Sequence, residues 1–323
     1  MPTPKVSVVV LTYNHARFID EALQSVFAQR TDFDFEILIT EDCSTDGTRE
    51  IVKRYAREHP SVITLLLSER NQNDNDVLTR ALRVARGELI ALLEGDDFWT
   101  SRDKLQRQVC FLDAHPECAS CVHNAWIVDE TGVRQPETFC PIGWQGPFTT
   151  RDVLRANFIP TCSTMLRRTV VDSLPSWFDR AIAQDWSLHL LCSERGAIGY
   201  LDEVMAAYRA HAGGLWSGSD TVGQLRRMVR SLEEVNDFTG RRYAAALAPR
   251  IARYEFRLAG LTRAQGDLAA AWRHLRRGMP AAVTSRQVSV REAGGLAARL
   301  LAASVRPVGV GLVRRWRMPQ RVR

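Results

Sequence analysis

Three carboxylates, those of Glu94, Asp96 and Asp97, lie at the end of one apolar run of the chain. The run ELIALLE, Glu88 to Glu94, is followed directly by Gly95, Asp96 and Asp97. Close carboxylates repel one another by on the order of a few kcal/mol at an intermediate effective dielectric. Hard divalent cations such as Mg²⁺ are commonly bound by one or two protein carboxylates together with substrate phosphates. This spacing therefore predicts a divalent metal site, for Mg²⁺ or Mn²⁺, with Gly95 allowing close approach of the backbone.

The same acids also have an ordinary structural explanation. An isolated pair of Asp residues can cap a helix or pair with Arg. That explanation weakens when the acids follow a buried strand at the ligand-binding edge of a sheet. Asp42 follows a second apolar run, Glu36 to Thr40, and a carboxylate there can accept hydrogen bonds from a base or a ribose hydroxyl. Asp46 is expected to hold the turn into the next helix.

Strand and helix patterns alternate over the first hundred residues. The predicted strands are residues 6–12, 36–40, 62–67 and 88–94, and the predicted helices are 16–28, 48–59 and 77–85. Apolar strands separated by helices indicate a mostly parallel, Rossmann-like sheet flanked by helices. Ligands of such sheets bind outside the carboxyl ends of the strands. The loops predicted to bind a ligand are therefore 13–15, 41–46, 68–76 and 94–99. Neither a GxGxxG nor a GxxxxGK[ST] motif occurs, so no dinucleotide fold or P-loop is predicted.

The alternation of strand and helix patterns breaks at Lys104, and after about Gly218 the pattern becomes helical. These two changes divide the chain into three parts. Residues 1–103 form the predicted parallel half, residues 104–218 could supply the second wall of a cleft at its ligand-binding edge, and residues 219–323 form a basic helical C-terminal region. The second part begins with a helix to about residue 114 and a strand over 118–128. In the third part, residues 254–279 predict an antiparallel helical hairpin with Gly266 and Asp267 at its turn.

Charge is divided unevenly along the chain. Thr221 to Arg323 contains 21 Arg against 6 Asp or Glu, whereas the preceding residues contain 22 basic and 31 acidic side chains. An acidic body does not favour nucleic acid, but an Arg-rich tail can meet anionic lipid. The last segment, Leu312 to Arg323, fits either a membrane-surface foot or a frayed, solvated tail. No run of 18 apolar residues and no signal-peptide layout occurs. We expect a cytoplasmic protein, with peripheral contact at the inner face of the membrane if that segment is a foot.

Seven scattered cysteines predict free thiols rather than a disulfide framework. Cys118 and Cys121, with His123 nearby, have the spacing of half a zinc or redox site. No second pair follows at zinc-ribbon spacing, and the stretch from Cys118 to Val128 is more typical of a strand.

Five motifs in the same chain order resemble glycosyltransferase family 2, a family of inverting enzymes with the A-type glycosyltransferase (GT-A) fold. They are VSVVVLTYNHARFIDEALQSVFAQ, EILITEDCSTDGT, GELIALLEGDDFW, QDW at Gln184 to Trp186, and YRAH at Tyr208 to His211. Together they cover roughly Val6 to Trp216. The resemblance implies an α/β domain of the GT-A fold over residues 1–218, followed by the helical region. Within this domain it implies a nucleotide-binding half over residues 1–103 and an acceptor-binding half over residues 104–218.

The resemblance also implies roles for individual residues. Thr12, Tyr13 and Asn14 would lie along the nucleotide, and Asp42 would bind its base. The segment Glu94 to Asp97 matches the DxD region of the family, in which one acid holds the metal and a neighbour contacts ribose. Glu94 stands where Asp is commoner. The residues expected to bind the nucleotide sugar are Thr12, Tyr13, Asn14, Asp42, Arg80, Glu94, Asp96, Arg209 and Trp216, and those expected to bind metal are Asp96, Asp97 and His211.

Asp185 matches the catalytic base of the family, although Gln184 replaces the usual Glu. An acceptor hydroxyl is a poor nucleophile until a positioned carboxylate removes its proton. Taken by itself, Asp185 would instead be an N-cap for a helix from Trp186 to Arg195. His211 could equally be a polar residue at a strand end.

The implied activity is transfer of a sugar, with inversion, from a nucleoside diphosphate sugar to a hydroxyl of a glycan or lipid-linked acceptor. UDP is the nucleotide the family prefers, and bacterial cell-surface polysaccharide is the expected product. The alternative is a non-catalytic nucleotide-sugar or glycan-binding module of the same fold with a helical partner-binding tail. Asp185 beside an intact acidic cluster favours the enzyme. A nucleotidyltransferase would need a Gly-rich, basic phosphate loop after the first strand, and TYNHAR is not one.

Overall fold

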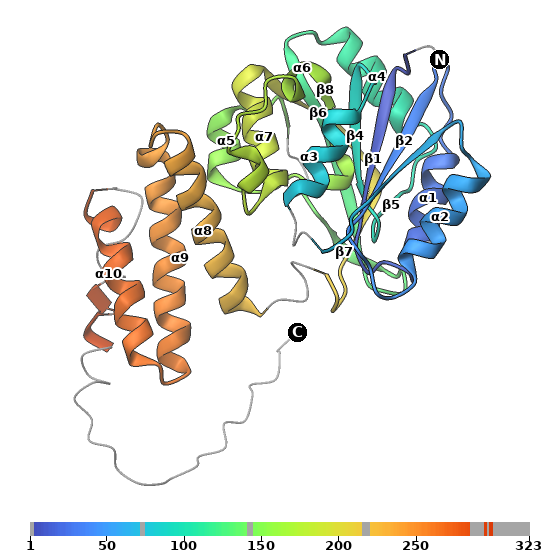
Figure 1. The fold of residues 1–323 in the computed structure, drawn as a ribbon. Coiled ribbons are helices and arrows are strands. Elements are labelled where there is room, and N and C mark those ends of the chain that lie inside the picture. Colours follow the sequence, from blue (N-terminus) through green and yellow to red (C-terminus); the bar gives the residue numbers. More distant parts are fainter. Residues whose placement is uncertain are drawn as a thin grey trace. The chain divides into compact units, whose positions relative to one another are not determined.

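The computed structural model describes residues 3–71, 75–140, 145–214, 220–284, 294–295 and 297–299. The chain divides into two compact units, Met1–Leu247 and Ala248–Arg323. The first unit is built on one nine-stranded sheet, and the described part of the second is helical (Figure 1).

The first half of the sheet is parallel and runs in the order β3-β2-β1-β4. Its strands are β1 (Val6–Thr12), β2 (Phe35–Glu41), β3 (Ile63–Leu67) and β4 (Leu89–Glu94). The connecting helices are α1 (Ile19–Phe27), α2 (Thr48–Glu58) and α3 (Asn75–Val84). Because right-handed crossovers run outward from β1 to β3 and then back to β4, α1 and α2 cover one face and α3 the other. Burial on both faces explains the almost unbroken apolar strands. The predicted strands and helices of this half are therefore confirmed.

The second half of the sheet is mixed, which accounts for the break in the alternation at Lys104. From β4 the order continues with β8 (Met165–Arg167), β6 (Cys118–Val128), β9 (Ala197–Arg209) and β5 (Phe98–Trp99), while β7 (Arg134–Thr138) pairs with β6. The helices of this half are α4 (Lys104–Ala114), α5 (Thr150–Arg155), α6 (Arg168–Val171) and α7 (Gln184–Arg195), with 3₁₀ turns η1 (Thr161–Ser163) and η2 (Phe178–Arg180).

The stretch with CxxC spacing is a strand, as predicted. Cys118 and Cys121 are buried in β6, and burial raises the pKa of Cys121 to about 12. All seven cysteines are described, and each is a free thiol. A protonated thiol inside a strand is a small apolar side chain rather than a metal ligand.

Helix α8 (Thr221–Phe238) belongs to the first compact unit. Its Glu234 Oε2 accepts a hydrogen bond from the backbone N–H of Ile182 at 3.0 Å, and Phe238 stacks on Trp177. The compact unit thus continues past residue 218, and the functional division predicted there stays a prediction.

The predicted helical hairpin is confirmed by α9 (Ala244–Ala264) and α10 (Leu268–Thr284). Gly266 has a φ of +86°, which favours glycine at this turn. The Asp267 carboxylate accepts a hydrogen bond from the backbone N–H of Ala270 at 2.9 Å and so caps α10. Ala259, Ala271 and Leu275 form a small core between the two helices.

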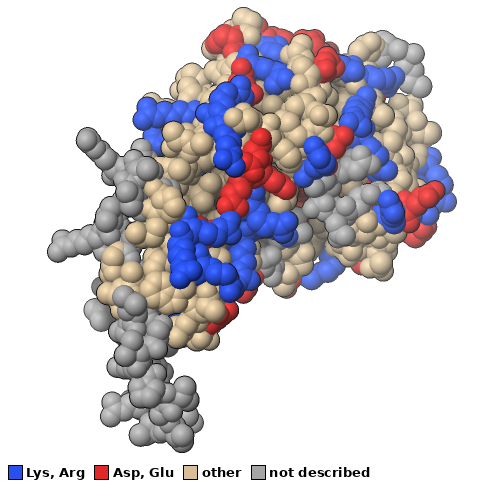
Figure 2. Space-filling model, turned by 60° about the vertical axis from the view of Figure 1, so that its left-hand side comes forward, with Lys and Arg blue, Asp and Glu red and all other residues tan. Residues whose placement is uncertain are grey.

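Surface charge is clustered rather than evenly mixed. Figure 2 shows one face of the molecule, on which Lys and Arg side chains gather into patches around a smaller group of Asp and Glu side chains. Within the part of the chain that the structure describes, no helix has the length and apolar character needed to cross a bilayer. The predicted foot, Leu312 to Arg323, lies outside the described residues.

Candidate active site

The loops that follow β1 and β2 hold each other in place. The side-chain oxygen of Asn14 accepts a hydrogen bond from the backbone N–H of Thr45 at 2.8 Å, and the backbone N–H of Asn14 donates to Ser44 Oγ at 2.9 Å. Asn14 and Cys43 both adopt left-handed backbone conformations, with φ of +55° and +62°. These two predicted ligand loops therefore form one connected rim at the carboxyl edge of the sheet.

Asp46 also connects these two loops through its hydrogen bonds. Its Oδ1 accepts hydrogen bonds from the backbone N–H of Thr48 at 3.0 Å and from the Thr48 hydroxyl at 2.6 Å, and its Oδ2 accepts from the backbone N–H of Ala16 at 2.9 Å. Although burial acts in the opposite direction, these hydrogen bonds lower the pKa of Asp46. The predicted role of Asp46 in the turn into α2 is confirmed, and the residue also supports the loop after β1.

The two acids at the end of β2 have different environments. Glu41 is fully buried and pairs with Arg49, whose guanidinium also donates to the backbone carbonyl of Ser68. Asp42 comes next, and its backbone N–H donates to the carbonyl of Thr12 at 3.1 Å. Glu41 is thus committed to holding the loops together, and Asp42 remains the candidate for recognising a base.

Asp96 lies between two imidazoles. Its Oδ2 is 3.0 Å from Nε2 of His211 and 3.5 Å from Nε2 of His15. Burial pushes the pKa of Asp96 upward, but the His15 and His211 rings outweigh it and lower the pKa. Asp96 is therefore the acid of the cluster that most readily carries a negative charge.

The surroundings of Glu94 and Asp97 disfavour the ionised form of each side chain. Burial together with the charges of Asp97, Asp96 and Asp185 raises the pKa of Glu94 well above its usual range. Burial and the Asp96 charge do the same to the pKa of Asp97. Asp97 Oδ1 accepts a hydrogen bond from the backbone N–H of Arg209 at 2.8 Å, whereas the buried Oδ2 has no hydrogen-bond partner among the described residues.

These features fit a divalent cation. An orphaned buried carboxylate oxygen and mutually repelling acids are both relieved when a cation binds beside them. Across the described ranges, no three His, Cys, Asp or Glu side chains stand close enough to hold a metal ion by themselves. A cation here would need further oxygen ligands, as Mg²⁺ does when it takes them from substrate phosphates and water.

Asp185 lies in the first turn of α7. The helix begins at Gln184 and its N-cap residue is Ala183, so the prediction of Asp185 as the N-cap of a helix from Trp186 is wrong. Its carboxylate accepts a hydrogen bond from Asn157 Nδ2 at 3.3 Å, and its charge contributes to raising the pKa of Glu94. The N-terminal end of a helix also favours a negative charge at this position.

Gln184, which stands where the family has Glu, has a structural role. Its side-chain Nε2 donates to the backbone carbonyl of Phe178 at 3.0 Å and to the hydroxyl of Thr79 at 3.3 Å. Thr79 lies in α3, so this amide connects α7 to the parallel half of the fold. Both partners accept hydrogen bonds, so this position needs a donor. The amide of Gln184 can donate, whereas an ionised Glu could only accept.

Arg209 is used largely inside the protein. The residue is 3% exposed, and its Nε donates to the backbone carbonyl of Asp96 at 2.8 Å. Its Nη2 pairs with Glu21, and its Nη1 lies 3.3 Å from the carbonyls of Asp129 and Glu130. These contacts position the acidic loop, and direct contact of Arg209 with a diphosphate stays a prediction.

The remaining predicted residues are spread along the rim. Thr12 is buried and Tyr13 is 41% exposed beside it. Arg80 reaches the loop after β3, where its Nη2 donates to Ser68 Oγ at 3.0 Å. Trp216 lies outside the described residues. The structure therefore forms an acidic cluster of Glu94, Asp96 and Asp97 in contact with His211, with Thr12 reaching Asp96 through His15. The charge of Asp185 acts on Glu94.

Two residues near this cluster were missed in the sequence. His15 follows Asn14 in a loop already selected as ligand-binding, so a basic side chain next to an acidic rim was an available signal. Cys162, whose thiol influences the pKa of Asp97, comes from η1 and carries no local signal. Burial, followed by the Asp97 and Glu94 charges, raises the pKa of Cys162 well above its usual range and keeps it protonated.

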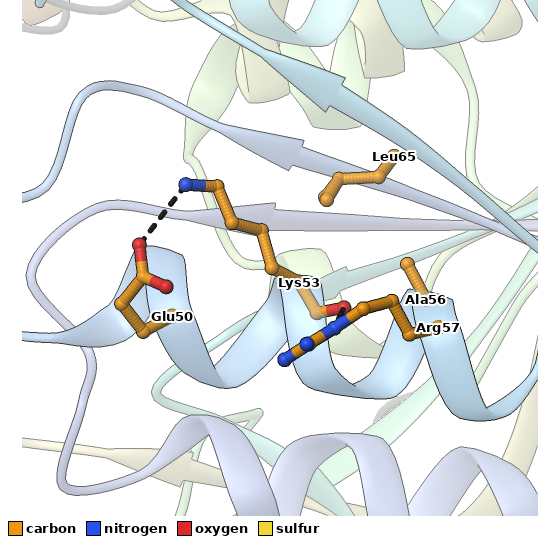
Figure 3. Close-up of a pocket in the computed structure, with 5 residues that line it drawn as sticks. All are labelled: Glu50, Lys53, Ala56, Arg57 and Leu65. Carbon is orange, nitrogen blue, oxygen red and sulfur yellow. Dashed lines mark hydrogen bonds and ion pairs between the residues drawn. The ribbon is translucent and has the colours of Figure 1, made fainter.

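A hollow of about 430 Å³ lies along the sheet edge between α2 and β3. Glu50, Lys53, Ala56, Arg57 and Leu65 line it, and Lys53 pairs with Glu50 at 3.0 Å (Figure 3). None of the predicted site residues contributes to this hollow, so it is separate from the acidic cluster.

Comparison with known proteins places this arrangement in a family. The sequence model described as Glycosyl transferase family 2 matches residues 7–174. An uncharacterized protein of Mycobacterium tuberculosis is 38% identical over 216 residues, which cover 67% of this chain and 61% of that protein. This chain therefore spans about three fifths of the length of that relative.

Two solved structures share the fold. Residues 1–349 of Staphylococcus aureus TarS, in complex with UDP-GlcNAc, match with a TM-score of 0.61 and 19% identity over 93% of this chain and 88% of that one. The mannosyltransferase PcManGT from Pyrobaculum calidifontis, in complex with GDP-Man and Mn²⁺, matches with a TM-score of 0.56 and 22% identity over 94% and 87% of the two chains. These likenesses confirm the predicted α/β fold of the GT-A type.

Proposed function

This chain belongs to glycosyl transferase family 2, and on that premise we propose that it transfers a sugar from a nucleoside diphosphate sugar to a hydroxyl of a glycan or lipid-linked acceptor. The observation that supports the proposal is the acidic loop after β4, where Asp96 Oδ2 lies 3.0 Å from His211 Nε2 and the buried Asp97 Oδ2 has no hydrogen-bond partner among the described residues. These acids follow the carboxyl end of a strand, where ligands of such folds bind, and Asp185 in the first turn of α7 is the proposed base.

The chemistry follows from the proposed roles. Asp185 would accept the proton of the acceptor hydroxyl while the hydroxyl oxygen attacks the anomeric carbon. The bond from that carbon to the diphosphate breaks on the opposite side, so that a single displacement inverts the configuration. Asp42 would bind the base, and the connected rim of Thr12, Tyr13 and Asn14 would lie along the nucleotide.

Asp96, Asp97 and His211 would hold a divalent cation, Mg²⁺ or Mn²⁺. When bound, such an ion supplies Lewis-acid stabilisation of the charge on the departing diphosphate. Arg209 acts by positioning the backbone of the acidic loop. The protein's part is to place these groups in advance, which lowers the cost of organising them in the transition state.

For the donor we propose a nucleotide, and for the product we propose a class of polysaccharide. Of the two solved structures compared above, TarS 1–349 holds UDP-GlcNAc and PcManGT holds GDP-Man with Mn²⁺. We propose UDP as the nucleotide, with GDP as its competitor. Staphylococcus aureus TarS is also 33% identical over 117 residues and is named a poly(ribitol-phosphate) β-N-acetylglucosaminyltransferase. Synthesis of a bacterial cell-surface polysaccharide is the corresponding proposal for this chain.

A thermal-shift screen of nucleotide sugars, with and without Mn²⁺, tests the proposal. The expected result is stabilisation by one nucleotide family that depends on Mn²⁺, followed by release of the nucleoside diphosphate when an acceptor is added. Stabilisation without any release over a broad set of acceptors would favour the alternative, a binding module of the same fold. The absence of stabilisation by every nucleotide sugar would contradict both.

Membrane contact is a separate proposal about the Arg-rich C-terminal segment. Deletion of Gly311 to Arg323 should reduce co-sedimentation of the protein with anionic liposomes and leave its co-sedimentation with neutral liposomes unchanged. Equal binding of the full and shortened chains would contradict it.

A further inference from the structure

His15 has a fixed backbone at the entrance to α1. Its N–H donates to Thr48 Oγ1 at 2.8 Å, and Thr48 is itself held by Asp46. Its carbonyl accepts hydrogen bonds from the N–H groups of Phe18 and Ile19, both at 2.8 Å, which begin the helix. The position of this residue is therefore set by the loops rather than by the acidic cluster.

The ring of His15 connects two parts of the candidate donor site. Its Nδ1 lies 3.3 Å from Thr12 Oγ1, and its Nε2 lies 3.5 Å from Asp96 Oδ2. The side chain is 16% exposed. Each ring nitrogen thus meets a residue that the proposed function places against the nucleotide or the metal.

Gly95 leaves the space that this arrangement needs. A Cβ atom at Gly95 would lie 2.8 Å from Thr12 Oγ1 and 2.9 Å from His15 Nδ1. Real Cβ atoms do not approach polar atoms so closely, so a larger residue would displace the ring. The glycine and the histidine are therefore geometrically coupled.

His15 and His211 contact the same carboxylate oxygen from different directions. Their ring centroids are 6.4 Å apart and the planes lie at 78° to each other. If Asp96 and His211 both turn to a cation, His15 remains as the side chain that holds Asp96 from the protein side. Groups that orient metal ligands in this way typically change metal affinity by about 10- to 100-fold when they are removed.

We propose that His15 is a positioning residue of the donor site, which holds the Asp96 carboxylate in the orientation that binds a metal-chelated nucleoside diphosphate. This inference rests on the proposed function. It assigns His15 no contact with the substrate and no part in proton transfer.

Three substitutions of His15 distinguish the contact of Nδ1 with Thr12 from the contact of Nε2 with Asp96. The amide nitrogen of Gln reaches about as far as Nε2 of His, whereas that of Asn reaches only about as far as Nδ1. H15Q can therefore still donate to Asp96, H15N can meet only Thr12, and H15A can meet neither. His115 is a matched control, because it is a half-exposed imidazole paired with Glu117.

The measurement is calorimetric titration of the full chain with UDP and with GDP, in Mn²⁺ and in chelator, beside thermal unfolding of each variant. In Mn²⁺, H15A and H15N should bind the better nucleotide at least about tenfold more weakly than wild type, and H15Q should recover most of the loss. Binding in chelator should change by less than about twofold in all three, because the proposed contact acts through the metal ligand. H115A should bind like wild type in both buffers.

The outcomes distinguish this inference from the proposed function. If wild type shows no Mn²⁺-dependent binding of either nucleotide, the proposed function fails and this inference with it. If wild type binds but H15A and H15N bind equally well, only the role of His15 is overturned. Equal losses with and without Mn²⁺, or losses in H15Q as large as in H15A, would show a general structural role and also overturn it.

Discussion

The backbone amide of Arg209 donates a hydrogen bond to Asp97 Oδ1 at 2.8 Å. This contact joins the loop after β4 to the last residue of β9, and the Arg209 guanidinium adds a second link to the carbonyl of Asp96. The acidic loop is therefore held by a strand from the other half of the sheet. Its shape depends on both halves, because one supplies the carboxylates and the other fixes how they point.

Replacing Asp96 and Asp97 together with Ala should remove Mn²⁺-dependent binding of UDP. The two carboxylates are the proposed metal ligands, and the buried Asp97 Oδ2 has no hydrogen-bond partner among the described residues. The variant should still fold but unfold at a lower temperature, because it loses the Asp96 carboxylate between His15 and His211 and the acceptor for the buried N–H of Arg209. Calorimetric titration in Mn²⁺ and a thermal unfolding curve measure the two effects. The control is Asp202→Ala, which changes an exposed acid. If the double variant bound UDP in Mn²⁺ as tightly as wild type, the assignment of these two residues as metal ligands would be wrong.

Asp185→Asn should abolish transfer while leaving nucleotide-sugar binding within about twofold. A positioned general base typically contributes about 10²- to 10⁴-fold in rate, and Asn keeps the size and the contact with Asn157 without the basic oxygen pair. Release of the nucleoside diphosphate in the presence of acceptor measures the rate, and thermal shift measures binding. Asp202→Asn serves as the control for loss of one acidic charge. Normal turnover of the Asp185 variant would remove the base assignment.

The sequence predicted the parallel half of the fold well because its signal is local. Each apolar strand is followed by a helix, and the rule that ligands bind at strand carboxyl ends selected the loops that carry Asn14, Asp42 and Asp96. The roles of Asp185 and His211 came only from the family motifs. No local pattern distinguishes a base from an N-cap, and the structure shows that the helix begins at Gln184, two residues earlier than expected.

The contacts that shape the site could not be predicted in the same way. The hydrogen bonds of the Arg209 guanidinium to the backbone of Asp96 and Asp129 depend on how β9 pairs with β5 and β6. Cys162 reaches Asp97 from a 3₁₀ turn far along the chain. Such pairs are set by strand register and by side-chain packing between distant segments, and neither is encoded in composition or periodicity.

Gly95→Ala and Gly260→Ala should have opposite effects on stability. At Gly95 the new methyl group meets Thr12 and His15 at under 3 Å, so the variant should lose about 1 to 3 kcal/mol of unfolding free energy and bind UDP more weakly. Gly260 lies inside α9 with open space around it, and Ala there should add about 0.5 to 1 kcal/mol. Urea unfolding and UDP titration of both variants provide the test. A Gly95 variant that keeps full stability and affinity would show that the close packing has no consequence.

Lys104→Met should stabilise the protein at neutral pH and remove part of its pH dependence. Lys104 is fully buried at the start of α4, its Nζ has no hydrogen-bond partner among the described residues, and it lies 3.9 Å from the Trp99 ring centroid. Burial lowers the pKa of Lys104 to about 7, while the unfolded chain keeps the ordinary 10.5. Between these values the unfolded state binds more protons than the folded state, so stability rises with pH by at most about 1.4 kcal/mol per pH unit. Urea unfolding at pH 7 and pH 9 should show that rise for wild type and a smaller one for Lys104→Met, which should be more stable at pH 7 by about 1 to 4 kcal/mol. Equal slopes for the two proteins, or a less stable variant at pH 7, would mean that the buried ammonium is compensated by its surroundings.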